Sequence, residues 1–260
     1  MARRYYNGRL GKFKYDNTEF KLMDGCLRYI GTETDGSKIK IPEGILDCSC
    51  MFKNCNIVTP PVIPAGVTNC HSMFYYCQSL KEPPVIPEGV VHCYGMFYQC
   101  VSLCKAPVIP DSVTSGNYMF YKCSSLTDAS DISVKIPFCS MMFQDCENLI
   151  KPPVLSEGII TATYMFARCR ALKEISSIPE SIGDCQFMFS GCFSLKYVGK
   201  TSMSDSCGSS YIFSRCGQLY NYSLVHTGDS YNEPYSHCTT ILQEISGFVH
   251  KFKERTRFNG

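Results

Sequence analysis

The chain has 260 residues and a formal net charge of +2, so it lacks the strong basic excess that proteins binding nucleic acid usually carry. No stretch approaches the roughly 20 apolar residues of a membrane-spanning helix, and no apolar segment follows Arg3-Arg4 to form a signal peptide. We therefore expect no nucleic-acid partner, no membrane span and a cytoplasmic location, with the cell surface or secretion by another route as the alternative.

Residues 1–46 are predicted to form a β-rich N-terminal cap. Phe13–Tyr15 and Glu19–Leu22 alternate apolar and polar side chains, as half-buried strands do. Asp24-Gly25 is a typical hairpin turn, and the alternation resumes at Cys26–Ile30. The pattern predicts a hairpin that turns at Asp24-Gly25.

A repeat occupies residues 47–219. Its signature, Met-Phe-x-x-Cys-x-x-Leu, begins at Met51, Met73, Met96, Met119, Met142, Met165 and Met188, and a divergent copy begins at Ile212. Successive copies are 22 to 24 residues apart. A fixed period in this range indicates a solenoid, in which each coil contacts only its neighbours. We predict about eight coils.

Each repeat divides into two parts. The segment after the Leu, for example Pro84–Pro87, contains too many prolines for a helix and should form an extended rung. The Met-Phe-x-x-Cys segment should form one short helical or 3-10 turn with Met, Phe and Cys facing inward. The fold expected is a parallel β-solenoid with short helical turns.

The cysteines follow the repeat. Of the 18 in the chain, eight stand four residues after the Met or Ile212: Cys55, Cys77, Cys100, Cys123, Cys146, Cys169, Cys192 and Cys216. Five stand three residues before the Met, at a position where other repeats have Gly116, Ala162 or Ser209. A disulfide partner would not be replaced so freely. We interpret both columns as buried thiols that act as small apolar side chains, with disulfides as the less favoured alternative.

Residues 220–260 are predicted to form a loop and a C-terminal helical cap. The apolar residues Ile241, Leu242, Ile245, Phe248, Val249 and Phe252 recur at the spacing of one helix face. Thr239-Thr240 is a suitable N-cap. The alternatives are a partner-binding helix and a helix that lies on a membrane surface.

The repeats resemble the BspA-like (Treponema-type) leucine-rich repeats. Cys93–Leu103 and Val85–Val90 carry the resemblance, which covers about residues 38 to 216. This chain has Met-Phe where the commoner form has Ala-Phe, and it has extra prolines at Pro83-Pro84 and Pro152-Pro153. The resemblance implies a curved parallel β-solenoid that serves for binding. Relatives are often surface adhesins, and the family brings no catalytic residues.

A column of charged residues lies nine residues after the Met. It reads Glu82, Lys105, Asp128, Lys151 and Glu174, with signs that alternate from coil to coil. Opposite charges on neighbouring rungs attract, so this column is expected to hold the register of the coils.

Tyrosines form the candidate contact surface. They stand one or two residues before the Met (or Ile212), or two or three residues after it. They comprise Tyr75, Tyr76, Tyr94, Tyr98, Tyr118, Tyr121, Tyr164 and Tyr211. Tyrosine is rigid, amphipathic and enriched at protein interfaces. The alternative is that these rings only cover the outside of the turns.

No catalytic or metal site is predicted. Cys48-Ser49-Cys50 lacks zinc-ligand spacing, and Cys70-His71 and His92-Cys93 place neighbouring side chains on opposite faces. No cofactor is expected. The sequence predicts a non-enzymatic scaffold that binds another protein, as an inhibitor, effector or phage-encoded counter-factor. A cell-surface adhesin that binds a host protein or a glycan is the alternative.

Overall fold

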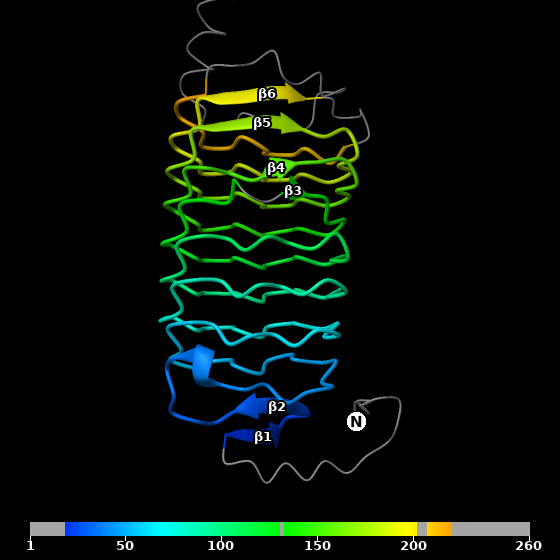
Figure 1. Ribbon diagram of the computed structural model, residues 1–260. Helices are drawn as coiled ribbons and strands as arrows, with labels where there is room; N and C mark the ends of the chain where they lie inside the picture. Colours follow the sequence, from blue (N-terminus) through cyan, green and yellow to red (C-terminus); the bar gives the residue numbers. More distant parts are fainter. Residues whose placement is uncertain (1–18, 131–132, 202–206, 220–260) are drawn as a thin grey trace, which may run out of the picture.

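The computed structural model is a stack of flat coils, with an N-terminal hairpin at one end (Figure 1). It describes residues 19–130, 133–201 and 207–219. The elements are β1 (Phe20–Met23), β2 (Cys26–Tyr29), the 3-10 helix η1 (Gly36–Lys38), β3 (Ser133–Val134), β4 (Val154–Leu155), β5 (Glu174–Ile178) and β6 (Tyr197–Thr201). The predicted C-terminal cap, residues 220–260, lies outside the described residues, and the three-part division of the chain stays a prediction.

Successive coils are joined in parallel. The position four residues before the Met pairs with the same position of the next coil, through Asp47, Asn69, His92, Ser115, Phe138, Thr161, Asp184 and Gly208. β3 also pairs with β4, and β5 with β6, in parallel register. These pairings confirm the predicted parallel solenoid.

The longest strands lie in rungs without a proline pair. β5 and β6 have five residues each, and the rung of β5 has Ile175-Ser176 where the rung of β4 has Pro152-Pro153. β4 is confined to the two residues after Pro152-Pro153. Because proline has no amide hydrogen to donate to the neighbouring rung, the Pro-rich rungs remain extended without a continuous ladder.

The Met-Phe segments are not helical turns, and this prediction was wrong. In the second coil the amide of Met73 donates to the carbonyl of Cys70 at 3.1 Å, and that of Cys77 to Phe74 at 3.0 Å. Each of these β-turns holds a left-handed residue in third place, Ser72 (φ 51°) and Tyr76 (φ 61°). Within the described residues η1 is the one 3-10 helix.

The left-handed residues serve the stacking of the coils. The amides of Ser72, Phe74 and Tyr76 donate to carbonyls of the next coil at 2.8–2.9 Å. A helical turn would direct these amides along its own axis instead. Hydrogen bonding between coils therefore outweighs the cost of positive φ at residues that are not glycine.

The core is a ladder of phenylalanines. Phe52, Phe74, Phe97, Phe120, Phe143, Phe166, Phe189 and Phe213 are fully buried, one in each coil. Neighbouring rings stack with centroids 5.2 to 5.7 Å apart and within 13° of parallel. The repeat period brings the same side chain to the same place in every coil, so the apolar columns predicted from the sequence become continuous stacks.

The N-terminal hairpin covers the first ring of this ladder. β1 and β2 pair antiparallel and turn at Asp24 (φ 50°) and Gly25 (φ 75°), which confirms the predicted hairpin. Phe20 meets the ring of Phe52 edge-on at 6.3 Å, and Tyr29 lies 5.4 Å from it. The hairpin thus covers the first coil and shields the ring of Phe52 from water.

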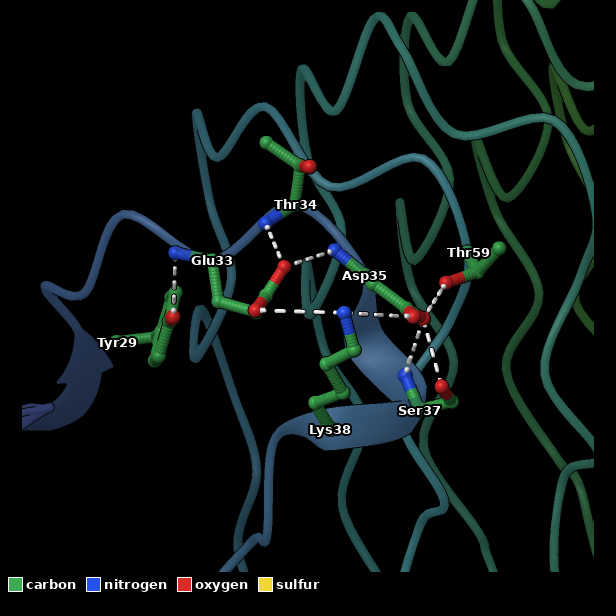
Figure 2. A network of polar contacts seen from close by, with 7 residues as sticks. All are labelled: Tyr29, Glu33, Thr34, Asp35, Ser37, Lys38 and Thr59. Carbon is green, nitrogen blue, oxygen red and sulfur yellow. Dashed lines mark hydrogen bonds and ion pairs between the residues drawn. The ribbon is translucent and has the colours of Figure 1, made fainter.

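A polar network ties this cap to the first coil (Figure 2). Asp35 Oδ1 accepts hydrogen bonds from the Ser37 hydroxyl at 2.6 Å, the Ser37 amide at 3.1 Å and the Thr59 hydroxyl at 2.7 Å. The hydrogen bond from the Ser37 side chain, followed by that from Thr59, lowers the pKa of Asp35 to about 2. Asp35 and Thr59 also form a parallel β-bridge, so the network fixes the register of the cap.

Asp128 and Lys151 of the charged column form an ion pair between neighbouring coils, as expected. Lys151 Nζ lies 2.9 Å from Asp128 Oδ2, on the preceding coil. A second cross-coil pair, which the column did not include, joins the Arg168 guanidinium to both carboxylate oxygens of Asp145. Both pairs are solvent-accessible, so each contributes at most about 1 kcal/mol, and their main effect is to hold the register.

The cysteines are thiols in all seventeen described positions, and most are buried. They are more than small apolar side chains, however. In the column after the Met, each thiol from Cys77 to Cys216 donates a hydrogen bond to the carbonyl oxygen of the phenylalanine in the preceding coil, at 2.9–3.1 Å. Cysteine therefore recurs at this position because it is small and also donates a hydrogen bond.

Candidate protein-binding surface

Three tyrosines stack directly on one another along the solenoid. Tyr75, Tyr98 and Tyr121 occupy the same position of consecutive coils, two residues after the Met. Their ring centroids are 4.5 and 4.6 Å apart, and the rings lie within 17° of parallel. Because neighbouring chains of a parallel ladder lie roughly 4.8 Å apart, equal residues at one exposed position stack.

Tyr76, Tyr94 and Tyr118 widen this stack. Tyr76 lies 4.9 Å from Tyr75, and Tyr118 lies 5.9 Å from Tyr121. Tyr94 lies 5.3 Å from Tyr118. The structure therefore brings six of the eight predicted tyrosines into one continuous surface, which we call the tyrosine face: Tyr75, Tyr76, Tyr94, Tyr98, Tyr118 and Tyr121.

Tyr164 and Tyr211 belong to a separate group. They sandwich Phe187, with centroids 4.7 and 5.0 Å from its ring. The coil between the two groups has Met141 and Gln144 at the positions that Tyr118 and Tyr121 occupy one coil earlier. The predicted stripe is therefore interrupted, and its last two members are not part of the tyrosine face.

The hydroxyl groups of Tyr75, Tyr94 and Tyr98 remain protonated at neutral pH, because the pKa of each is raised. Burial, together with the neighbouring Tyr75 and Tyr121 hydroxyls, raises the pKa of Tyr98 to about 12. Burial also raises the pKa of Tyr75 and of Tyr94. The face presents apolar rings together with neutral groups that can donate or accept hydrogen bonds.

Cations lie at both ends of the stack. Lys53 Nζ is 4.8 Å from the centroid of the Tyr75 ring, and Lys122 Nζ is 5.4 Å from that of Tyr121. Both distances suit cation–π attraction, which holds the ammonium groups against the outermost rings. A partner that covers the face would meet positive charge at its margins.

His71, which was not predicted as a contact residue, stacks on Tyr94 at 5.1 Å. Both residues stand two positions before a Met, so an alignment of that column indicates the pair. A stripe of outward-facing valines on the rungs was not predicted either. Val62, Val85 and Val108 are 79%, 86% and 69% exposed, because each lies between residues that point inward.

The described residues contain no group of three or more His, Cys, Asp or Glu side chains placed to hold a metal ion. Nor does that part of the chain include a helix long and apolar enough to cross a membrane. Most described thiols are buried, and burial raises their pKa, as for Cys93 to about 12 and Cys55 to about 11.

Three solved structures of bacterial leucine-rich repeat proteins are similar to this chain. The protein from T. pallidum is 20% identical, with a TM-score of 0.49 over 84% of this chain and 95% of that one. The Eubacterium ventriosum protein is 16% identical, with a TM-score of 0.34 over 73% and 64% of the two chains. The Bacteroides ovatus protein is 19% identical, with a TM-score of 0.30 over 68% and 66%.

None of the curated proteins matches the sequence significantly. The family model described as the BspA type leucine rich repeat region matches six copies, over residues 34–127 and 136–248. The match spans most of the chain and coincides with the parallel coils and the stacked phenylalanines seen in the structure. The chain belongs to the BspA-type leucine-rich repeat family.

Proposed function

We propose that the protein is a non-enzymatic scaffold that binds another protein through the tyrosine face. Members of this repeat family are generally non-catalytic binding modules. The observation that carries the proposal is the contiguous stack of six half-buried or exposed tyrosines on three consecutive coils. Isolated surface tyrosines are common, whereas a continuous aromatic surface of this kind is typical of an interface.

Rigidity supports this assignment. The rings are held against each other and against a backbone that hydrogen bonds to both neighbouring coils. Little side-chain entropy is therefore left to lose when a partner binds. Each ring offers apolar area together with a hydroxyl, the combination found in the residues that dominate binding energy.

Charge indicates what the partner's surface should carry. Lys53 and Lys122 flank the stack, so acidic or carbonyl-rich groups at the partner's margin would be favoured. We propose an intracellular role as an inhibitor, effector or phage-encoded counter-factor, in a cytoplasmic location. The many buried thiols support this location, because disulfides are rare where the cell keeps thiols reduced.

A cell-surface adhesin is the second candidate, with a host protein or, less favoured, a glycan as its ligand. The flat tyrosine stack supports it, because aromatic rings can pack against the apolar faces of sugars. Thiol titration of the denatured protein from its source separates the two locations. A count close to eighteen supports the reducing compartment, whereas extensive pairing contradicts it.

The experiment that tests the binding proposal is a quantitative pull-down with matched variants. Tagged wild-type protein, Tyr98→Ser/Tyr118→Ser and the control Val85→Thr/Val108→Thr are each incubated with extract of the source cells. The valine control alters the exposed rung stripe and leaves the tyrosine face intact. We expect one protein that wild type and control both retain and the tyrosine variant loses. Equal retention by the wild type and both variants, or no specific retention, would count against the proposal.

A further inference from the structure

Two cysteine thiols of adjacent coils lie against each other near the C-terminal end of the described coils. Cys185 belongs to the thiol column three residues before Met188, whereas Cys207 lies in the next coil, two residues before Ser209 of that column. Their Sγ atoms are 3.2 Å apart. Both side chains are buried, with Cys207 retaining 8% exposure.

We propose that Cys185 and Cys207 are a modification site, which closes to an intramolecular disulfide when the chain meets a disulfide of the glutathione class. A disulfide requires the sulfurs at about 2.05 Å. The two Sγ atoms already lie 3.2 Å apart, so closing the pair needs a movement of the sulfurs of about 1 Å.

The reaction is two thiol–disulfide exchanges. The Cys207 thiolate attacks one sulfur of oxidised glutathione, which forms a mixed disulfide and releases the first glutathione thiolate. The Cys185 thiolate then attacks the Cys207 sulfur and releases the second. Two protein thiols are oxidised, one glutathione disulfide is reduced to two thiols, and the two protons pass from the protein to the released thiolates.

Cys207 is suited to the first attack for two reasons. It is the more exposed member of the pair. The hydrogen bond from the Cys185 thiol also lowers the pKa of Cys207, against the opposing effect of burial. Cys185 lies directly beside it, so its thiol is placed to attack the mixed disulfide.

The other buried thiols have different partners. Cys146 and Cys169 stand on consecutive coils too, yet each donates to a phenylalanine carbonyl at 3.1 Å. Cys139 donates to the Thr161 carbonyl at 3.2 Å. Selectivity for Cys185 and Cys207 over these three thiols therefore follows from the contact between the two sulfurs, and Cys146 with Cys169 serves as an internal control.

The disulfide would join two successive coils of the solenoid. It closes a loop of residues 186–206, which is nearly one repeat long. A cross-link of this length restricts the unfolded chain and stabilises the folded one. The last described coils would become harder to unfold in an oxidising environment. The presence of the disulfide would indicate that the protein has been in an oxidising compartment.

The test is to equilibrate the full chain in glutathione buffers of increasing oxidised fraction, block free thiols by acid quenching and alkylation, and map the peptides by mass spectrometry. We expect a peptide pair linked through Cys185 and Cys207, lighter by two hydrogens, while Cys146 and Cys169 are alkylated after denaturation. A persistent glutathione adduct on Cys207, a reduced pair at every ratio, or prior linkage of Cys146 to Cys169 would each overturn the proposal.

Variants provide the second measurement. Cys185→Ala copies the residue that Ala162 supplies in another coil, so the chain should fold. This variant should accumulate the glutathione adduct on Cys207, because the resolving thiol is gone. Oxidation should raise the urea midpoint of the wild type and should not raise that of Cys185→Ala. An equal shift in both proteins would contradict the assignment.

Discussion

The thiol of Cys123 donates a hydrogen bond to the carbonyl oxygen of Phe97 at a distance of 3.1 Å. The same carbonyl accepts the amide of Cys100, which closes the turn of its own coil. A buried carbonyl oxygen has two lone pairs, and here each coil supplies one donor. The contact recurs down the column, so cysteine links each turn to the one before it.

Replacing Cys123 by Ala should cost more than the same change at Cys93. Both side chains are fully buried, and the Cys123 thiol donates a hydrogen bond to a backbone carbonyl. The position of Cys93 is occupied in other coils by Gly116 and Ala162, which have no thiol to donate. The lost hydrogen bond should lower the free energy of unfolding by about 1 kcal/mol more at Cys123. Urea denaturation of the two variants measures the difference, and equal costs would show that the thiol only fills space.

Native alkylation should be fast at Cys104 and slow at the buried thiols. Cys104 is exposed, whereas burial of Cys93 and Cys139 raises the pKa of each to about 12. Only the thiolate reacts, so these two thiols are protected by both inaccessibility and protonation at pH 8. Timed iodoacetamide labelling with peptide mapping checks this. Cys104→Ser should remove the fast phase, and comparable rates at Cys93 and Cys104 would contradict the burial of the columns.

Acid should weaken the attachment of the N-terminal cap through Asp35. Its pKa is about 2 in the folded chain and roughly 3.9 in an unfolded one. A lowered pKa contributes stability that is fully present above about pH 4 and is lost as the pH falls through about 2. Asp35→Asn should therefore lie below wild type in urea midpoint at pH 5 and converge with it near pH 2. Thr59→Val should show part of the same effect, and parallel curves for Asp35→Asn and wild type would exclude this role.

Phe120→Ala should be among the most damaging single changes. The ring stacks on Phe97 at 5.4 Å and on Phe143 at 5.2 Å, so its removal opens a gap in the middle of the ladder. Loss of a fully buried phenylalanine typically costs about 3–5 kcal/mol. Phe138→Ala is the matched control, because that ring is 45% exposed and its removal should cost roughly 0.5 kcal/mol or less. Urea or thermal unfolding compares the two, and similar losses would contradict the ladder as the core.

Much of this fold can be predicted from the sequence, because each position of the repeat occurs in several copies that can be compared. The Phe97 column and the Cys100 column never change their character, so their burial follows from the alignment alone. The geometry of the turns could not be predicted in this way, because a tyrosine such as Tyr118 (φ 59°) does not indicate a left-handed backbone. Gly95 in the same column (φ 55°) was the available signal.

The candidate surface was only partly predictable, for a similar reason. Columns show that Tyr75, Tyr98 and Tyr121 must stack, because one position repeats at the coil spacing. Contacts between different columns, such as Tyr98 with Tyr118 at 6.5 Å, depend on the path of the turn and need the structure. The interruption at Gln144 was visible in the sequence, but it matters only once the rings are known to touch.

The measurement that tests the central claim most directly is the affinity of the captured partner for wild-type protein, Tyr98→Ala and Val85→Thr. Tyr98 lies at the centre of the face, in contact with Tyr75, Tyr118 and Tyr121. Central aromatic residues often contribute about 2 kcal/mol or more, so Tyr98→Ala should weaken binding by about thirtyfold or more. Val85→Thr should leave the affinity within about twofold of wild type. The reverse pattern, with Val85→Thr weakening binding and Tyr98→Ala leaving it unchanged, would place the partner on the rungs and contradict the tyrosine face as the binding surface.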